Sequence, residues 1–137
     1  MASAAAAGPR KAAPLRGEIW SADLEPQSRR SEPGKTDRPV LIIQIDLLND
    51  KERWHNVIVI PGTTDVDAVE PAANYPLRVR VQKAGSLKSD TDLLISEVRS
   101  IAKDRLRNKM LTLAPNHLKK ITKALAMLTG YIPVAAD

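Results

Sequence analysis

A polar loop that ends in an arginine and a proline carries residue types that can hold a phosphate. The loop Ser31–Asp37 leads through Arg38 and Pro39 into an apolar run. Arg38 therefore sits where a mobile loop meets a rigid strand, and its planar guanidinium can bind a phosphate through two parallel hydrogen bonds. Thr63 ends the next apolar run. Its hydroxyl can either donate to a phosphate oxygen or cap its own turn.

Composition excludes several kinds of catalytic site. The chain has no cysteine and two histidines, His55 and His117, so thiol nucleophiles, disulfides and His-rich or Cys-rich metal sites are excluded. We expect no cofactor and no metal. The net charge of +5 favours a polyanion such as nucleic acid or an acidic protein as partner, and a basic surface without such a partner is the alternative. No apolar run is long enough to span a bilayer, and we expect a cytoplasmic protein.

The length of 137 residues suits one domain with one core, and an aromatic content of 3% makes that core aliphatic. Residues 1–14 are rich in Ala, Gly and Pro and are expected to form a disordered tail, with the domain over 15–137.

The domain itself reads as short strands with turn signals between them, followed by one helix. Leu118, Ile121, Leu125 and Leu128 recur at helical spacing after Pro115, and Gly130 is a helix stop. This pattern predicts a mainly β small barrel with a C-terminal α-helix. Strands are expected at 18–24, 39–45 (central), 57–60 (stopped by Pro61-Gly62), 77–81 (with one arginine face), 92–101 and 109–113.

Six short segments together resemble the MazF/PemK family of toxin endoribonucleases, in the family's order and over roughly residues 16–130. They are Arg16-Gly17-Glu18-Ile19-Trp20, Asp23-Leu24-Glu25-Pro26, the loop with Arg38-Pro39-Val40-Leu41, Pro61-Gly62-Thr63-Thr64, Tyr75-Pro76-Leu77-Arg78-Val79, and Val98-Arg99-Ser100-Ile101 with Lys103-Asp104-Arg105-Leu106.

The resemblance implies an SH3-like barrel, as in PemK and CcdB, and a homodimer that cuts single-stranded RNA without a metal. It also implies inhibition by an acidic antitoxin, for which a chain of charge +5 is the right complement. Such an enzyme uses the 2′-hydroxyl of the RNA as nucleophile, so it needs a proton acceptor, a proton donor and cations. The resemblance gives acid–base work to Arg38, although arginine is better suited to electrostatic stabilisation. It places Thr63 in the active site and Glu32 against the substrate.

This sequence departs from the family at two places. Asp37 is one residue more than common members have between the glutamate and the arginine, and it could pair with Arg38. Ser96 stands where some members carry an aspartate proposed as the base. Glu97 is the candidate base here, and an ion pair of Glu97 with Arg99 or Arg80 is the alternative. Because side chains alternate along a strand, Glu97 could replace an acid at 96 only with a bulge.

Basic side chains beyond this centre could follow an RNA backbone, or form an ordinary solvated face. Trp54 and Tyr75 are candidate base-stacking residues, whereas Trp20 is expected in the core. The substrate-binding candidates are Arg29, Glu32, Lys35, Thr64, Arg78, Arg80 and Arg99.

Two other functions remain open on these observations. A poison of DNA gyrase similar to CcdB would share the fold but cleave nothing. A relative that binds RNA without cleaving it is the second, because of Asp37 and Ser96.

Overall fold

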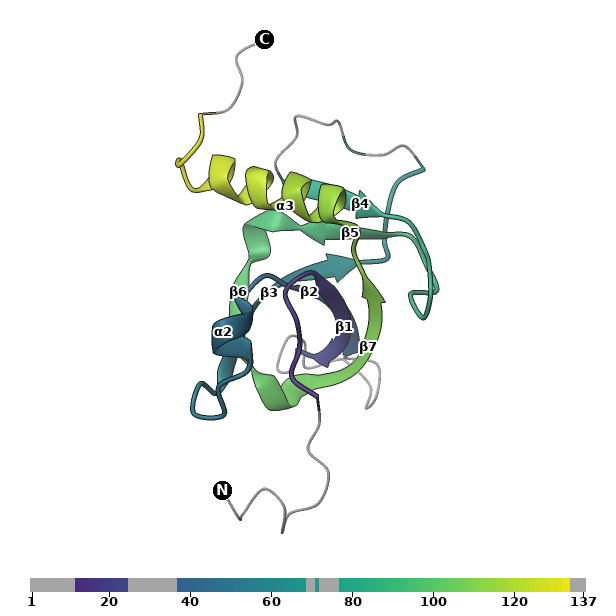
Figure 1. The fold of residues 1–137 in the computed structure, drawn as a ribbon. Helices are drawn as coiled ribbons and strands as arrows, with labels where there is room; N and C mark the ends of the chain where they lie inside the picture. Colours follow the sequence, from purple (N-terminus) through teal and green to yellow (C-terminus); the bar gives the residue numbers. More distant parts are fainter. Residues whose placement is uncertain (1–11, 25–36, 69–70, 72–76, 134–137) are drawn as a thin grey trace.

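The computed structural model describes residues 12–24, 37–68, 71 and 77–133. In this part of the chain, short strands dominate and one long helix follows them (Figure 1). The elements are β1 (Glu18–Asp23), β2 (Asp37–Ile42), α2 (Asp46–Asn49), β3 (Asn56–Thr63), β4 (Arg78–Val81), β5 (Thr91–Leu94), the 3₁₀ turn η1 (Ile95–Glu97), β6 (Arg99–Ala102), the 3₁₀ turn η2 (Lys103–Arg105), β7 (Leu106–Thr112) and α3 (Pro115–Leu128).

The strands pair in the order β4-β5-β3-β2-β1-β7, and β6 pairs with β3. Every pair is antiparallel. β3 belongs to two groups of strands, because its first part pairs with β2 and β6, and its last two residues, Gly62 and Thr63, pair with β5. β1, β2, β3, β6 and β7 curl into a small barrel, and β4 and β5 extend from it beneath α3 (Figure 1). The prediction of a mainly β barrel with a C-terminal helix is confirmed.

Alternation along the strands divides the apolar side chains into two clusters. Val57 and Val59 of β3 pack inside the barrel with Trp20, which is 5% exposed as expected for a core residue. Ile60 faces the other way and joins a second cluster with Leu93 of β5 and Ile121 of α3. The barrel sheet is therefore covered by apolar side chains on both of its faces.

The terminal helix begins and ends as its sequence predicts. Pro115 lies in its first turn, and Gly130 has φ +83° just beyond its end. The Tyr131 N–H donates to the Ala126 carbonyl at 2.8 Å and the Gly130 N–H to the Met127 carbonyl at 3.2 Å. These two bonds form a Schellman motif, which needs a residue with positive φ at Gly130.

Two predicted strand boundaries are wrong. Pro61-Gly62 does not stop the third strand, which continues to Thr63. The Ile43 N–H donates to the Ile58 carbonyl at 3.1 Å, so by the alternation of an antiparallel ladder Pro61 falls at a position that donates no bond to β2. On the other side of β3, the pairing with β6 ends at Val59, two residues before Pro61. The missing N–H of Pro61 therefore removes no hydrogen bond from either ladder.

The expected strand 92–101 is interrupted by η1, which contains Ser96 and Glu97, both exposed. The argument that Glu97 needs a strand bulge therefore does not apply. The other strand predictions hold with shifted ends: β2 begins two residues earlier and ends at Ile42, and β7 begins at Leu106. In the expected N-terminal tail, residues 1–11 lie outside the described part of the chain, and Pro14 is already buried.

Glu18 is a buried carboxylate at the start of β1, 5% exposed. One of its oxygens accepts from the Leu15 N–H at 2.8 Å and from the Trp20 indole N–H at 3.0 Å. Its other oxygen lies 3.1 Å from the Lys109 ammonium. Burial by itself raises the pKa of Glu18, but these hydrogen bonds and the lysine charge outweigh it, so the pKa lies below its ordinary value of 4.5.

We predict that Glu18→Gln destabilises the fold at neutral pH by about 1–3 kcal/mol, because the amide replaces a charged acceptor. A lowered folded-state pKa gives stability that is full above the unfolded pKa and is lost as pH falls through the folded pKa. The difference between wild type and variant should therefore shrink below about pH 4. Urea denaturation across this range measures it, and a constant difference would contradict the prediction.

Candidate active site

Arg38 lies in β2, and its guanidinium is anchored to the backbone of β3. The Nε and Nη2 atoms of Arg38 both donate to the Gly62 carbonyl, at 3.2 and 2.9 Å. One edge of the guanidinium is thus held, and within the described part of the chain Nη1 has no hydrogen-bond partner. The Nη1–Nη2 edge keeps the parallel N–H groups that can bind two phosphate oxygens.

Thr63 directly follows the residue that holds Arg38. It is half-buried at the end of β3, and its Oγ1 accepts from the Asp65 N–H at 3.1 Å. This is the turn-capping contact that the sequence offered as one reading of Thr63. The same contact is compatible with the second interpretation, in which Thr63 donates to a phosphate oxygen, because a hydroxyl oxygen that accepts an N–H still has its own O–H to donate. Thr64 is exposed beyond it.

Strand pairing continues this site across β5 and β4. Thr63 lies opposite Asp92, and Asp92 lies opposite Arg80. Residues directly opposite in a ladder share a face, and on β3 this is the face that lines the barrel interior. On β2, Arg38 lies on the same barrel-lining face, because it is two residues before Val40, whose side chain is inside the barrel. The lining changes from apolar to polar where β3 leaves the barrel.

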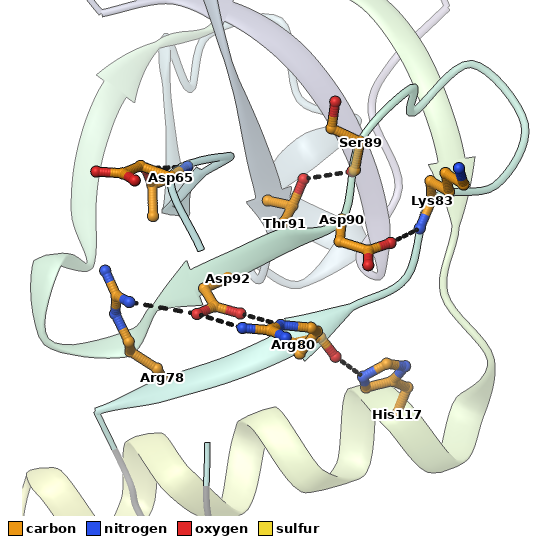
Figure 2. A network of polar contacts seen from close by, with 10 residues as sticks. Asp65, Arg78, Arg80, Lys83, Ser89, Asp90, Thr91, Asp92 and His117 are labelled. Atoms are coloured by element: carbon orange, nitrogen blue, oxygen red, sulfur yellow. Dashed lines mark hydrogen bonds and ion pairs between the residues drawn. The ribbon is translucent and has the colours of Figure 1, made fainter. Parts of the chain in front are cut away.

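Asp92 is the most buried charged group of this region, at 1% exposed, and it binds two arginines (Figure 2). The Arg80 Nε donates to Asp92 Oδ1 at 2.8 Å and its Nη2 to Oδ2 at 3.4 Å. The Arg78 Nη1 donates to Oδ2 at 3.3 Å. The Arg80 side chain is 6% exposed and that of Arg78 34%. The arginine face predicted for this strand is thus organised around a carboxylate.

The sequence reading missed Asp92. Its alternation with Leu93 at the start of a strand gave no sign of function, and its partners lie 12 and 14 residues earlier.

Arg80 is held by a further contact at its backbone, where its carbonyl lies 2.8 Å from His117 Nε2 on α3 (Figure 2). A carbonyl can only accept, so Nε2 carries the proton of that imidazole.

The two departures from the family have separate outcomes. Asp37 is exposed, and it forms no ion pair with Arg38, whose guanidinium is turned to Gly62. Neighbouring residues on a strand point to opposite faces, which separates the two charges. Glu97 is exposed on η1 and is not paired with Arg99 or Arg80, which are both in the described part of the chain. The expected alternative of an ion pair is therefore not seen.

Arg99 lies on β6 opposite Val59, which places it on the barrel-lining face that also carries Thr63. Trp54 is 46% exposed, and its indole donates to Gln44 Oε1 at 3.3 Å near the start of β3, at the opposite end from Thr63. Four residues singled out from the sequence, Arg29, Glu32, Lys35 and Tyr75, lie outside the described residues.

Over the described residues, no three His, Asp or Glu side chains form a group that could hold a metal ion. In the same part of the chain, no helix has both the length and the apolar character that crossing a membrane requires.

Comparison with known proteins identifies the family. Residues 15–129 match the model of the "PemK-like, MazF-like toxin of type II toxin-antitoxin system" family. The chain belongs to this family. The match covers all of the described strands and helices, so the family assignment applies to the whole barrel and its helix.

Individual relatives agree with this assignment. The chain is 29% identical over 116 residues to a protein named Endoribonuclease MazF from Staphylococcus saprophyticus, covering 84% of this chain and 90% of that protein. Its fold is similar to that of MazF in a MazE–MazF crystal structure from Deinococcus radiodurans, with TM-score 0.67, 18% identity, and coverage of 89% and 100%. It is also similar to an endoribonuclease from a Mycobacterial species in complex with its cognate antitoxin, with TM-score 0.62, 23% identity, and coverage of 88% and 96%.

We predict that Gly62→Ala destabilises the protein by about 1–3 kcal/mol, the usual effect of an overpacked core site. A Cβ at this position would meet Thr91 Cγ2 at 2.6 Å, and Thr91 is fully buried. Adding Thr91→Ser removes that methyl group and should restore most of the loss, because the hydroxyl that bonds to Ser89 remains. Thermal denaturation of the single and double variants tests this, and a double variant as unstable as Gly62→Ala would contradict it.

Proposed function

We propose that the chain is a sequence-specific endoribonuclease toxin that cuts single-stranded RNA through attack of a 2′-hydroxyl, without a metal. The observation that carries this proposal is the anchoring of Arg38 on the Gly62 carbonyl, next to Thr63. It leaves a pre-oriented guanidinium edge and a hydroxyl at one point on the face of the sheet. Fixed donors of this kind stabilise charge that develops in a transition state. Family membership and a relative named as an endoribonuclease support the same activity.

In the proposed reaction, the 2′-oxygen of the RNA attacks the adjacent phosphorus and the bond to the 5′-oxygen breaks. The products are a 2′,3′-cyclic phosphate and a 5′-hydroxyl. Arg38 holds two non-bridging phosphate oxygens through its free edge, and the Thr63 hydroxyl donates to one of them. Glu97 is the proposed acceptor of the 2′-hydroxyl proton, since its carboxylate is exposed and is not paired with Arg99 or Arg80. The departing 5′-oxygen takes its proton from solvent water, which gives the 5′-hydroxyl.

The proposal includes partners. Solved relatives include a toxin bound to its cognate antitoxin and a MazE–MazF complex. We propose that this chain also binds an antitoxin, an acidic one that neutralises it and that the charge of +5 would attract. We further propose that it acts as a cytoplasmic homodimer. Arg99, on the barrel-lining face, and Thr64 are proposed to contact the RNA, together with Arg29, Glu32 and Lys35.

We predict that the protein cuts a long single-stranded RNA at discrete sites in the presence of EDTA, leaving 2′,3′-cyclic phosphate ends. Arg38→Ala should lower the cleavage rate by about 10³-fold and Arg38→Lys by about 10²-fold, because lysine keeps the charge but not the two-pronged geometry. Primer extension and analysis of the fragment ends measure both.

Arg53→Ala is the matched control, because Arg53 is exposed near the start of β3 and far from Thr63. It should cleave like wild type. RNA bound but not cut by folded wild type would favour the non-cleaving relative. Neither binding nor cutting, with inhibition of DNA gyrase, would favour the CcdB-like function.

A second prediction distinguishes the contribution of the Thr63 hydroxyl to cleavage from that of the side-chain volume. Thr63→Val has nearly the same volume but no hydroxyl, and it should cleave about 10²-fold more slowly. Thr63→Ser keeps both the donor and the cap on Asp65, and it should retain most of the activity. Initial rates on one RNA substrate compare them. Equal rates for the valine and serine variants would show that the hydroxyl has only the capping role.

A further inference from the structure

Arg78 and Arg80 are equivalent in the sequence, but the structure gives them different surroundings. Both bind Asp92 from the same strand face (Figure 2). The Arg80 side chain is 6% exposed and lies along Asp92, whereas that of Arg78 is 34% exposed and contacts Asp92 through Nη1 alone. Within the described residues, the Nε and Nη2 atoms of Arg78 have no hydrogen-bond partner.

Asp92 is close to the proposed catalytic centre but is a poor candidate for the base. As the cross-strand partner of Thr63, its Cβ lies about 5 Å from that of Thr63. Its carboxylate is 1% exposed, and both oxygens accept from arginines. A proton acceptor must reach the 2′-hydroxyl, which a covered carboxylate bound to two cations does not do. Its position suits the orientation of neighbouring groups.

We propose that Asp92 is a positioning residue, which holds the Arg78 guanidinium so that its free N–H groups bind an RNA phosphate next to the one held by Arg38 and Thr63. Arg80 is then the buried counter-charge that holds the Asp92 carboxylate in place. This inference rests on the proposed endoribonuclease function and adds Asp92 to its site.

The spacing of the strands supports a neighbouring phosphate over the scissile one. β4 lies two strand spacings from β3, or about 10 Å, and Arg78 reaches back from β4 to the carboxylate on β5. Arg38 approaches from the opposite side, on β2. The two guanidinium groups therefore flank Thr63, which lies between them along the sheet.

Whether Asp92→Asn strengthens or weakens the binding of RNA shows whether Asp92 orients Arg78 or only contributes a negative charge. Asp92→Asn removes a negative charge, which by itself would tighten the binding of a polyanion. If Asp92 instead orients Arg78, the same substitution weakens binding although the protein becomes more positive. The probe is a fluorescein-labelled 2′-O-methyl oligonucleotide of random sequence, which cannot be cleaved because its nucleophile is blocked.

We expect Arg78→Gln to weaken binding of this probe about 10-fold and to lower the slope of log K against log salt by about 0.7, the share of one phosphate contact on a single strand. Asp92→Asn should weaken binding by a similar factor. The double variant should be no weaker than either single variant, because both remove the same contact. In cleavage assays, Arg78→Gln should raise KM and leave kcat nearly unchanged, as expected for a contact that is equally strong in ground and transition states.

A second variant protects the test against loss of folding, since Asp92→Asn removes the negative charge that lies against the buried Arg80. Asp92→Val combined with Arg80→Met replaces the buried pair by apolar groups at unchanged net charge. It should fold, keep Arg78 and still bind the probe about 10-fold more weakly. The inference would be overturned if the folded Asp92→Val/Arg80→Met variant bound the probe as tightly as wild type, or if Asp92→Asn bound it more tightly than wild type. It would also be overturned if wild type did not bind the probe.

The proposed function is judged separately. Wild type that binds the probe but cuts no RNA would overturn the endoribonuclease proposal, while the binding data still decide the role of Asp92. If wild type cuts RNA but the effects of Asp92→Asn and Arg78→Gln on binding are additive, only the proposed role of Asp92 is overturned, and the endoribonuclease proposal stands. Arg53→Gln is the control for removing one exposed arginine, and it should leave binding within about 2-fold of wild type.

Discussion

The continuation of β3 through Pro61 and Gly62 is the constraint on which the rest of the structure depends. Because the strand does not end there, it leaves the barrel and pairs with β5 in its last two residues. Gly62 permits this path, since any side chain would meet the buried Thr91. The same two residues create the site: the Gly62 carbonyl holds Arg38, and Thr63 faces Asp92.

The site uses the two faces of a strand for different purposes. On the barrel-lining face of β3, Val57 and Val59 are packed in a core, and Thr63 continues the same row into a polar region. The opposite face carries Ile60 into the cluster beneath α3. A doubly covered strand therefore ends in Thr63, a residue of the candidate site, and its packing limits the motion of that residue. Groups that are fixed in advance reduce the entropy cost of binding a substrate.

Burial also determines which charges can act. Three arginines, Arg38, Arg78 and Arg80, lie around Thr63 and Asp92, but their exposure differs. Arg80 is almost fully covered and is neutralised by Asp92, whereas Arg38 and Arg78 keep unbonded N–H groups. Like charges this close would repel if all were free, and a buried carboxylate among them reduces that repulsion.

Sequence patterns were enough to predict the barrel and helix, the core position of Trp20 and the cap at Gly130, and they singled out Arg38 and Thr63 as candidate site residues. These depend on local periodicity and on short segments, which a sequence displays directly. The fold was needed to show that β3 runs through Pro61, that η1 interrupts the strand at Ser96, and that Asp92 lies between Thr63 and Arg80 in the sheet. Those outcomes depend on pairing between strands far apart in the chain, where a register and a buried partner have no local signature.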